Sequence, residues 1–226
     1  MLTKTLDARR DPSISAVDAA MMARCIALSR TAADEGEYPF ATVIALDGNV
    51  VAEAINRTVR DGDVSRHAEV IALSHAQLAL TRHQLRRCTL YTIVEPCAMC
   101  SFCIRETGIG SVVYAISSPV MGGLSRWNIL RDTGMSDRMP QVFSGVPEIV
   151  SGVMMREAGQ AWRDWYPFGW QMIQFLGLLK EEGAEDDQIE IFPRRRPSLW
   201  RYIRMLFARN GRTKRIRTSE SDDRAL

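Results

Sequence analysis

The sequence predicts an α/β domain in which helices flank one mixed five-stranded β-sheet. Apolar, β-branched runs alternate with segments of helical periodicity in the order β-β-α-β-α-β, which is typical of a single sheet packed between helices. The sheet opens with a hairpin, because runs 41–46 and 50–54 flank Asp47-Gly48-Asn49. That tripeptide favours a tight antiparallel turn.

The other elements follow from periodicity and from helix-ending residues. Residues 18–35 have helical spacing, with Met22, Cys25 and Ile26 on one face and Gly36 at the end. The remaining strands are predicted from short β-branched runs at 88–94, 111–116 and 149–153. The remaining helices of the domain are predicted at 67–80, 97–108 and 155–165.

A long connection, residues 117–147, separates the fourth strand from the fifth. Connections of this length usually have a function, and this one is expected to wall a substrate pocket. Residues 125–132 are predicted to form a short helix that carries Arg126, Trp127 and Asn128.

Composition is that of a globular protein with an appendage. The chain has 226 residues and a hydrophobic fraction of 46%, enough for one domain with a large core. It has no run of about 20 apolar residues, and residues 1–10 lack the apolar stretch of a signal peptide. Five cysteines, an odd number, favour a reducing compartment, so a cytoplasmic location is expected.

The net charge of +2 conceals an uneven distribution. Residues 194–217 contain ten Arg or Lys and no Asp or Glu, which leaves the rest of the chain at −8. Residues 198–208 are predicted to form a basic amphipathic helix, followed by a disordered tail. Such a helix can bind RNA, an anionic membrane surface, a partner protein, or the acidic core of a second copy.

Two short pieces carry the chemistry: His67-Ala68-Glu69 and Pro96-Cys97-Ala98-Met99-Cys100. One imidazole and two thiols three residues apart suit a zinc ion, with His67, Cys97 and Cys100 as ligands and about one Zn²⁺ per chain. Three protein ligands leave a fourth position open for water, which marks a catalytic zinc. The H-x-E…P-C-x-x-C pattern is that of zinc-dependent base deaminases. A lone C-x-x-C would equally fit a structural zinc or redox thiols.

Glu69 is the candidate catalytic residue. Its carboxylate can take a proton from the attacking water and deliver it to the ring nitrogen beside the attacked carbon, and then help ammonia leave. The exocyclic amine of the substrate thereby becomes a carbonyl. Cys103 lies three residues past Cys100, but His67 already fills the third ligand position.

From about residue 18 to 165 the chain resembles the cytidine/deoxycytidylate-type zinc deaminase superfamily, in the branch of tRNA adenosine deaminases and bacterial guanine deaminases. The zinc motifs, Leu90-Tyr91-Thr92-x-x-Glu95-Pro96-Cys97 and Ala54-Ile55-Asn56 carry this resemblance. It implies a three-layer α-β-α sandwich and a homodimer. Expected parts are a lead-in at 1–17, a deaminase domain at 18–166 and an extension at 167–226.

The expected substrate-binding residues rest on the same resemblance and on position. The Asn that matches Asn56 hydrogen-bonds the base in this family, and Ala68 and Phe40 are expected to bind the substrate as well. Trp127 is expected in the pocket wall. Arg66 stands where the family usually has a small residue, so it is either a solvated charge at a helix cap or a contact to an anionic or carbonyl group.

The substrate itself is predicted less sharply. Tyr38-Pro39-Phe40 is more like the free-base enzymes, and Ala115-Ile116-Ser117-Ser118 lacks the Arg-Asp pair of the tRNA-acting members. A free purine base or nucleoside therefore comes first, and adenosine in tRNA, favoured by the basic tail, is the alternative. A non-enzymatic RNA-binding or scaffold protein with an inherited zinc is a further alternative. Glu69 argues against it.

Overall fold

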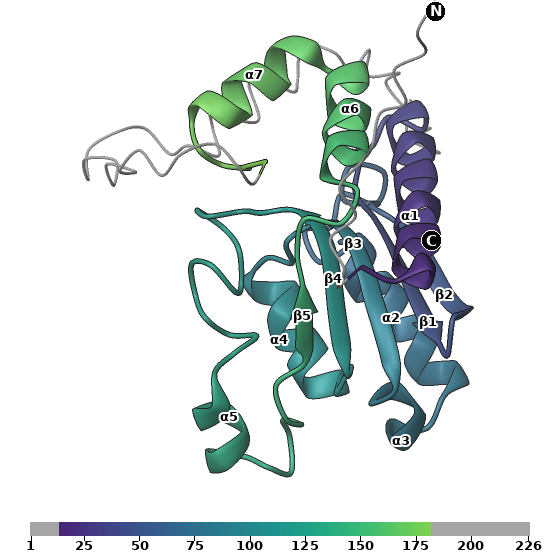
Figure 1. Cartoon of the computed structure of the whole chain (residues 1–226), viewed down its shortest axis with the longest axis vertical. Coiled ribbons are helices and arrows are strands. Elements are labelled where there is room, and N and C mark those ends of the chain that lie inside the picture. Colours follow the sequence, from purple (N-terminus) through teal and green to yellow (C-terminus); the bar gives the residue numbers. More distant parts are fainter. Residues whose placement is uncertain (1–13, 182–226) are drawn as a thin grey trace, which may run out of the picture. The chain divides into compact units, whose positions relative to one another are not determined.

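The computed structural model describes residues 14–181, and all of these belong to one structural unit. Its centre is a five-stranded sheet in the order β2-β1-β3-β4-β5 (Figure 1). The strands are β1 (Ala41–Leu46), β2 (Asn49–Ile55), β3 (Cys88–Val94), β4 (Ser111–Ile116) and β5 (Glu148–Val150). The predicted mixed sheet is confirmed.

Strand directions divide the sheet into an antiparallel half and a parallel half. β1 runs antiparallel to β2 and to β3, whereas β3, β4 and β5 run parallel. Asp47 and Gly48 join β1 to β2 with φ values of 50° and 78°, the two left-handed residues that a tight hairpin turn needs. Antiparallel neighbours can share such a turn, but parallel ones need the helical crossovers that follow.

Helices cover both faces of the sheet and make three layers (Figure 1). On one face lie α1 (Ala16–Asp34) and α6 (Met155–Trp165), which also contact each other; α2 (Ala68–Ala79) and α4 (Ala98–Thr107) lie on the other. α1 begins with a capping box, in which Ser15 and Asp18 satisfy each other's backbone N–H groups. Gly108, with φ of 82°, ends α4 in the left-handed conformation.

The main hydrophobic core fills the space between the sheet and the face that carries α2 and α4. Buried side chains of the sheet and of these two helices meet there, among them Ile44, Leu73, Leu90, Ile104 and Val112. Nearly every residue of β1 and β3 is buried, so both faces of these two strands are covered, as expected of central strands between two helical layers.

The structure differs from the predicted elements in three places. Residues 125–132 are turns and not a helix, because Asn128 has φ of 54°; the short helix is α5 (Thr133–Arg138). β5 is shorter than predicted, because Gly152 and Met154 take positive φ values just beyond it. A one-turn helix, α3 (Arg82–Leu85), was not predicted. Its capping box pairs Thr81 with Gln84.

After α6 the chain continues to pack on the domain. α7 (Pro167–Phe175) places Trp170 against Trp162, with ring centroids 5.9 Å apart. Lys180 then bridges to Ser117 at the end of β4. Every helix within residues 14–181 is too short or too polar to cross a lipid bilayer. Residues 1–13 of the predicted lead-in (1–17), the basic helix at 198–208 and the tail lie outside the described residues, whereas residues 16 and 17 already belong to α1.

Candidate active site

The three predicted ligands come together where two helices begin. His67 is the N-cap of α2 and Cys97 is the N-cap of α4, and Cys100 follows in the first turn of α4. Neither cap residue uses its side chain to satisfy the backbone N–H groups of its helix. The imidazole and the thiol are therefore free for another role, and the positive ends of two helix dipoles favour thiolates between them.

The ligand atoms form a nearly equilateral triangle. Nδ1 of His67 lies 3.6 Å from Sγ of Cys97 and 3.4 Å from Sγ of Cys100, and the two sulfurs are 3.6 Å apart. A tetrahedral zinc with usual bond lengths would separate two sulfurs by about 3.8 Å and a sulfur from a nitrogen by about 3.5 Å. Among residues 14–181, these three form the group of His, Cys, Asp and Glu side chains that can hold a metal ion. The donor set and its geometry fit zinc.

Glu69 adjoins this triangle from the same helix as His67. Its Oε2 lies 3.6 Å from Sγ of Cys100, and its Oε1 accepts a hydrogen bond of 3.3 Å from the Thr92 hydroxyl on β3. The carboxyl group is buried. It is thus held beside the ligands without being needed as one of them.

The electrostatics of the ligand cluster favour at least one thiolate. The hydrogen bond that links Cys97 to Cys100 lowers the pKa of Cys97 to about 4, and burial raises the pKa of Glu69. Burial lowers the pKa of His67, but its hydrogen bond with Cys97 and the charge of Glu69 raise it more. A metal ion held by the three ligands would displace these shared protons and offset the repulsion among the acidic groups.

Asn56 and Phe40 lie together at the strand ends beside the ligand helix. The backbone N–H of Asn56 donates to the Phe40 carbonyl at 2.9 Å, and that of Arg57 donates to the Arg66 carbonyl at 3.0 Å, directly before His67. The Phe40 ring packs edge-on against Trp162, with centroids 5.1 Å apart. The structure therefore brings Asn56, Phe40 and the buried Ala68 next to the metal ligands, and their contacts to a substrate stay predictions.

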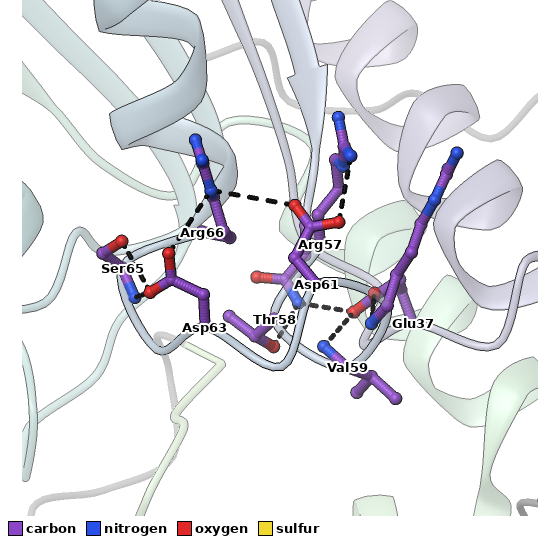
Figure 2. Close-up of polar contacts among 10 residues, drawn as sticks. Glu37, Arg57, Thr58, Val59, Asp61, Asp63, Ser65 and Arg66 are labelled. Atoms are coloured by element: carbon purple, nitrogen blue, oxygen red, sulfur yellow. Dashed lines mark hydrogen bonds and ion pairs between the residues drawn. The ribbon is translucent and has the colours of Figure 1, made fainter. Parts of the chain in front are cut away.

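Arg66 is an exposed residue at the start of α2. Its guanidinium lies 3.4 Å from Asp63 and 3.7 Å from Asp61, in the loop between β2 and α2 (Figure 2). Two carboxylates thus already neutralise this side chain. The solvated-charge interpretation has the stronger geometric support, and a substrate contact of Arg66 stays a prediction.

The connection after β4 is held in place by Glu95, a residue that the sequence did not single out for a role. This carboxylate is 3% exposed. It accepts hydrogen bonds from the backbone N–H groups of Ser118 (2.9 Å), Leu124 (3.0 Å) and Ser125 (2.7 Å), and from the Ser125 hydroxyl. Because Glu95 is two residues before Cys97, it fixes the connection beside the metal ligands.

Trp127 belongs to this anchored segment. Its backbone N–H donates to the carbonyl of Gly122, which bridges to Cys97. The indole is 58% exposed, and the Arg126 guanidinium lies 5.4 Å from its ring centroid. The ring is exposed on a segment whose backbone is tied to Cys97, and its role in the pocket wall stays a prediction.

Arg105 is a second buried charge that sequence reasoning missed. It is 1% exposed and lies on α4. One terminal nitrogen donates to the carbonyls of Ile129 (2.7 Å) and Asp132 (2.9 Å), and the other donates to Ser136 and Ser144. Arg105 therefore fastens the second half of the connection to the helix that carries both thiols.

Comparison with known proteins decides the family. Residues 15–116 match the family model of the cytidine and deoxycytidylate deaminase zinc-binding region. A probable cytosine deaminase of Schizosaccharomyces pombe is 38% identical over 138 residues, which cover 61% of this chain and 78% of the relative. The chain belongs to this deaminase family. It is therefore a zinc-dependent hydrolytic deaminase with a cytidine deaminase-like fold.

Other relatives of this deaminase have different named substrates. A tRNA-specific adenosine deaminase of Agrobacterium fabrum is 32% identical over 57% of this chain and 85% of its own length. A guanine deaminase of Nitrosomonas europaea superposes with a TM-score of 0.55 at 26% identity, over 69% of this chain and 88% of that one. Another relative is a tRNA(Ile)-lysidine synthase of Deinococcus radiodurans. It is 34% identical over 64% of this chain, but the matched part is only 24% of the length of the synthase.

Proposed function

We propose that this deaminase converts the exocyclic amine of a free purine base or nucleoside to a carbonyl and releases ammonia. The observation that carries this proposal is the convergence of a buried carboxylate, Glu69, with the three atoms suited to zinc. A scaffold protein has no need for a carboxylate enclosed beside an open ligand position.

In this proposal His67, Cys97 and Cys100 would hold a zinc ion, which would act as a Lewis acid and activate a water molecule. Glu69 accepts a proton from that water and passes it to the ring nitrogen next to the attacked carbon. The Thr92 hydroxyl, 3.3 Å from Oε1, keeps the carboxylate in one orientation. Burial, which raises the pKa of Glu69, brings its proton affinity closer to that of the groups it serves.

Support for a small heterocycle comes from Phe40, which lies next to Asn56, and from the relatives. Phe40 is packed against Trp162 at the end of a strand and next to Asn56, where an aromatic edge can border a planar ring. A cytosine deaminase has the highest identity of the relatives described above, and a guanine deaminase shares the fold.

Adenosine in tRNA is the second candidate. A tRNA-specific adenosine deaminase is 32% identical to the chain. The exposed Trp127, with Arg126 beside it, is the kind of ring on which an unpaired RNA base stacks. The basic stretch 194–217 would supply phosphate contacts.

One experiment separates the two candidates. Zinc-loaded protein is incubated with guanine, adenine, cytosine and their nucleosides, and ammonia is measured; in parallel, tRNA is incubated and its inosine content is measured. Glu69→Gln protein is the matched control for contaminating activity. Ammonia from a free base or nucleoside supports the leading proposal. Inosine in tRNA without any small-molecule turnover refutes it and supports the second candidate.

A further inference from the structure

Glu37 is a buried acidic residue in the turn that leads into β1. It is 2% exposed. Three donors converge on its carboxylate: the Arg60 N–H at 2.6 Å, the Val59 N–H at 3.1 Å and the Asn56 side-chain amide at 2.9 Å (Figure 2). Burying a carboxylate is costly unless donors compensate, and these three donors make the burial of Glu37 favourable.

The cluster determines how the Asn56 amide is turned. Nδ2 of Asn56 donates to Oε2 of Glu37 at 2.9 Å and to Oγ1 of Thr58 at 2.8 Å. An amide group has two N–H donors, and a carboxylate can only accept. The reversed amide would place its oxygen against the carboxylate, so the orientation follows from chemistry as well as from the coordinates.

Both side-chain N–H donors of Asn56 are therefore used within the protein. Within residues 14–181, Oδ1 of Asn56 has no hydrogen-bond partner. The residue also lies beside the metal ligands, because its backbone N–H is bonded to Phe40 and the next residue is bonded to the carbonyl before His67. What Asn56 can offer to a bound ring is an acceptor and not a donor.

We propose that Glu37 is a positioning residue that fixes the Asn56 amide, so that the substrate must present an N–H donor to Oδ1. This inference rests on the proposed function, in which Asn56 contacts the substrate. It narrows the substrate class to heterocycles with an available ring N–H. Free purine bases and cytosine carry a ring N–H, whereas adenosine and cytidine carry none, because the sugar occupies that nitrogen.

The test exchanges donor and acceptor between positions 37 and 56. Glu37→Gln, Asn56→Asp and the double variant are compared on the substrate that the wild type deaminates best in the panel above, tRNA included. Glu37→Gln allows the Asn56 side-chain amide to reverse its orientation, and about a ten-fold loss in kcat/KM is expected. Asn56→Asp places two carboxylates together, and a loss of at least about 100-fold is expected.

The double variant decides the question. The amide introduced at position 37 donates to the carboxylate introduced at position 56, and the Thr58 hydroxyl can rotate to donate as well. An acceptor then faces the substrate again, and the double variant should recover at least about ten-fold over Asn56→Asp alone. A merely structural role for Glu37 predicts that the two losses add, because the Val59 N–H still loses its acceptor. Activity of the double variant equal to or below that of Asn56→Asp overturns the proposal.

The controls separate this inference from the proposed function. Glu53→Gln, on the same β2 hairpin but ion-paired with Arg24 at the surface, should stay within about two-fold of wild type. All variants should retain zinc. Wild-type activity on tRNA alone refutes the small-molecule substrate and, because adenosine has no ring N–H, also refutes the required N–H donor. Recovery in the double variant would then support only that Glu37 orients the Asn56 amide. Turnover of free bases without that recovery refutes the positioning role alone.

Discussion

Replacing Glu95 by Gln is expected to destabilise the connection that follows β4. The carboxylate accepts from three backbone N–H groups, with Ser118 on Oε2 and Leu124 and Ser125 on Oε1. Gln keeps one oxygen. If that oxygen serves Leu124 and Ser125, the Ser118 N–H faces an NH₂ group and loses its acceptor.

An unpaired buried N–H costs about 1–3 kcal/mol. For a domain of this size, a loss of about 2 kcal/mol lowers Tm by about 4–8 °C. The assay is thermal unfolding of zinc-loaded protein followed by circular dichroism, with zinc content measured before each scan. Glu106→Gln is the matched control, because Glu106 is exposed on α4 and should change stability by less than about 0.5 kcal/mol. A Glu95→Gln protein with full zinc and the wild-type Tm would refute this account of the connection.

Gly122 gives an independent test of the same anchor. A Cβ at Gly122 would overlap the Glu95 carboxyl group, so Gly122→Ala is expected to destabilise the wild-type protein. In a Glu95→Ala background the obstructing group is gone. The cost of the two substitutions together should then be lower than the sum of the single costs by about 0.5–3 kcal/mol. If the two stability costs simply add, the Cβ introduced at position 122 does not clash with the Glu95 carboxyl group.

Four further predictions concern the metal, the proton, the assembly and the tail. Purified protein should hold about one zinc per chain, and Cys97→Ala with Cys100→Ala should remove it and the stability it adds; full zinc occupancy in that double variant would contradict the ligand assignment. Glu69→Gln should keep zinc and lose activity by about 10²–10⁴-fold, and near wild-type rates would mean that another group moves the proton. Light scattering at micromolar protein should give the mass of a dimer, because apolar rings such as Phe102 on α4 are exposed; a monomer mass would exclude the dimer under those conditions. Deleting residues 194–226 should leave small-molecule turnover nearly unchanged, whereas a folded but inactive truncation would support an RNA substrate.

Local sequence patterns predicted most of the architecture. The hairpin around Asp47-Gly48-Asn49, the capped helix that begins beside Ser15 and the strands at 88–94 and 111–116 depend on residues close together in the chain. The failures were also local: the apolar and polar pattern at 125–132 resembled a helix. There, hydrogen bonds from Ser125 to the distant Glu95 and the left-handed Asn128 determined the backbone instead.

The sequence by itself determined the zinc site, because ligand type and spacing are short-range properties. Cys97 and Cys100 share one helical turn, and His67 begins a helix as its N-cap, so their convergence needed only the expected fold. Tertiary structure alone identified the buried charges. Glu37 bonds to Arg60 across 23 positions, Glu95 to Ser125 across 30 and Arg105 to Ser144 across 39. From sequence alone, a charged residue is expected to be exposed to solvent. Only the folded chain brings together the distant donors and acceptors that make its burial favourable.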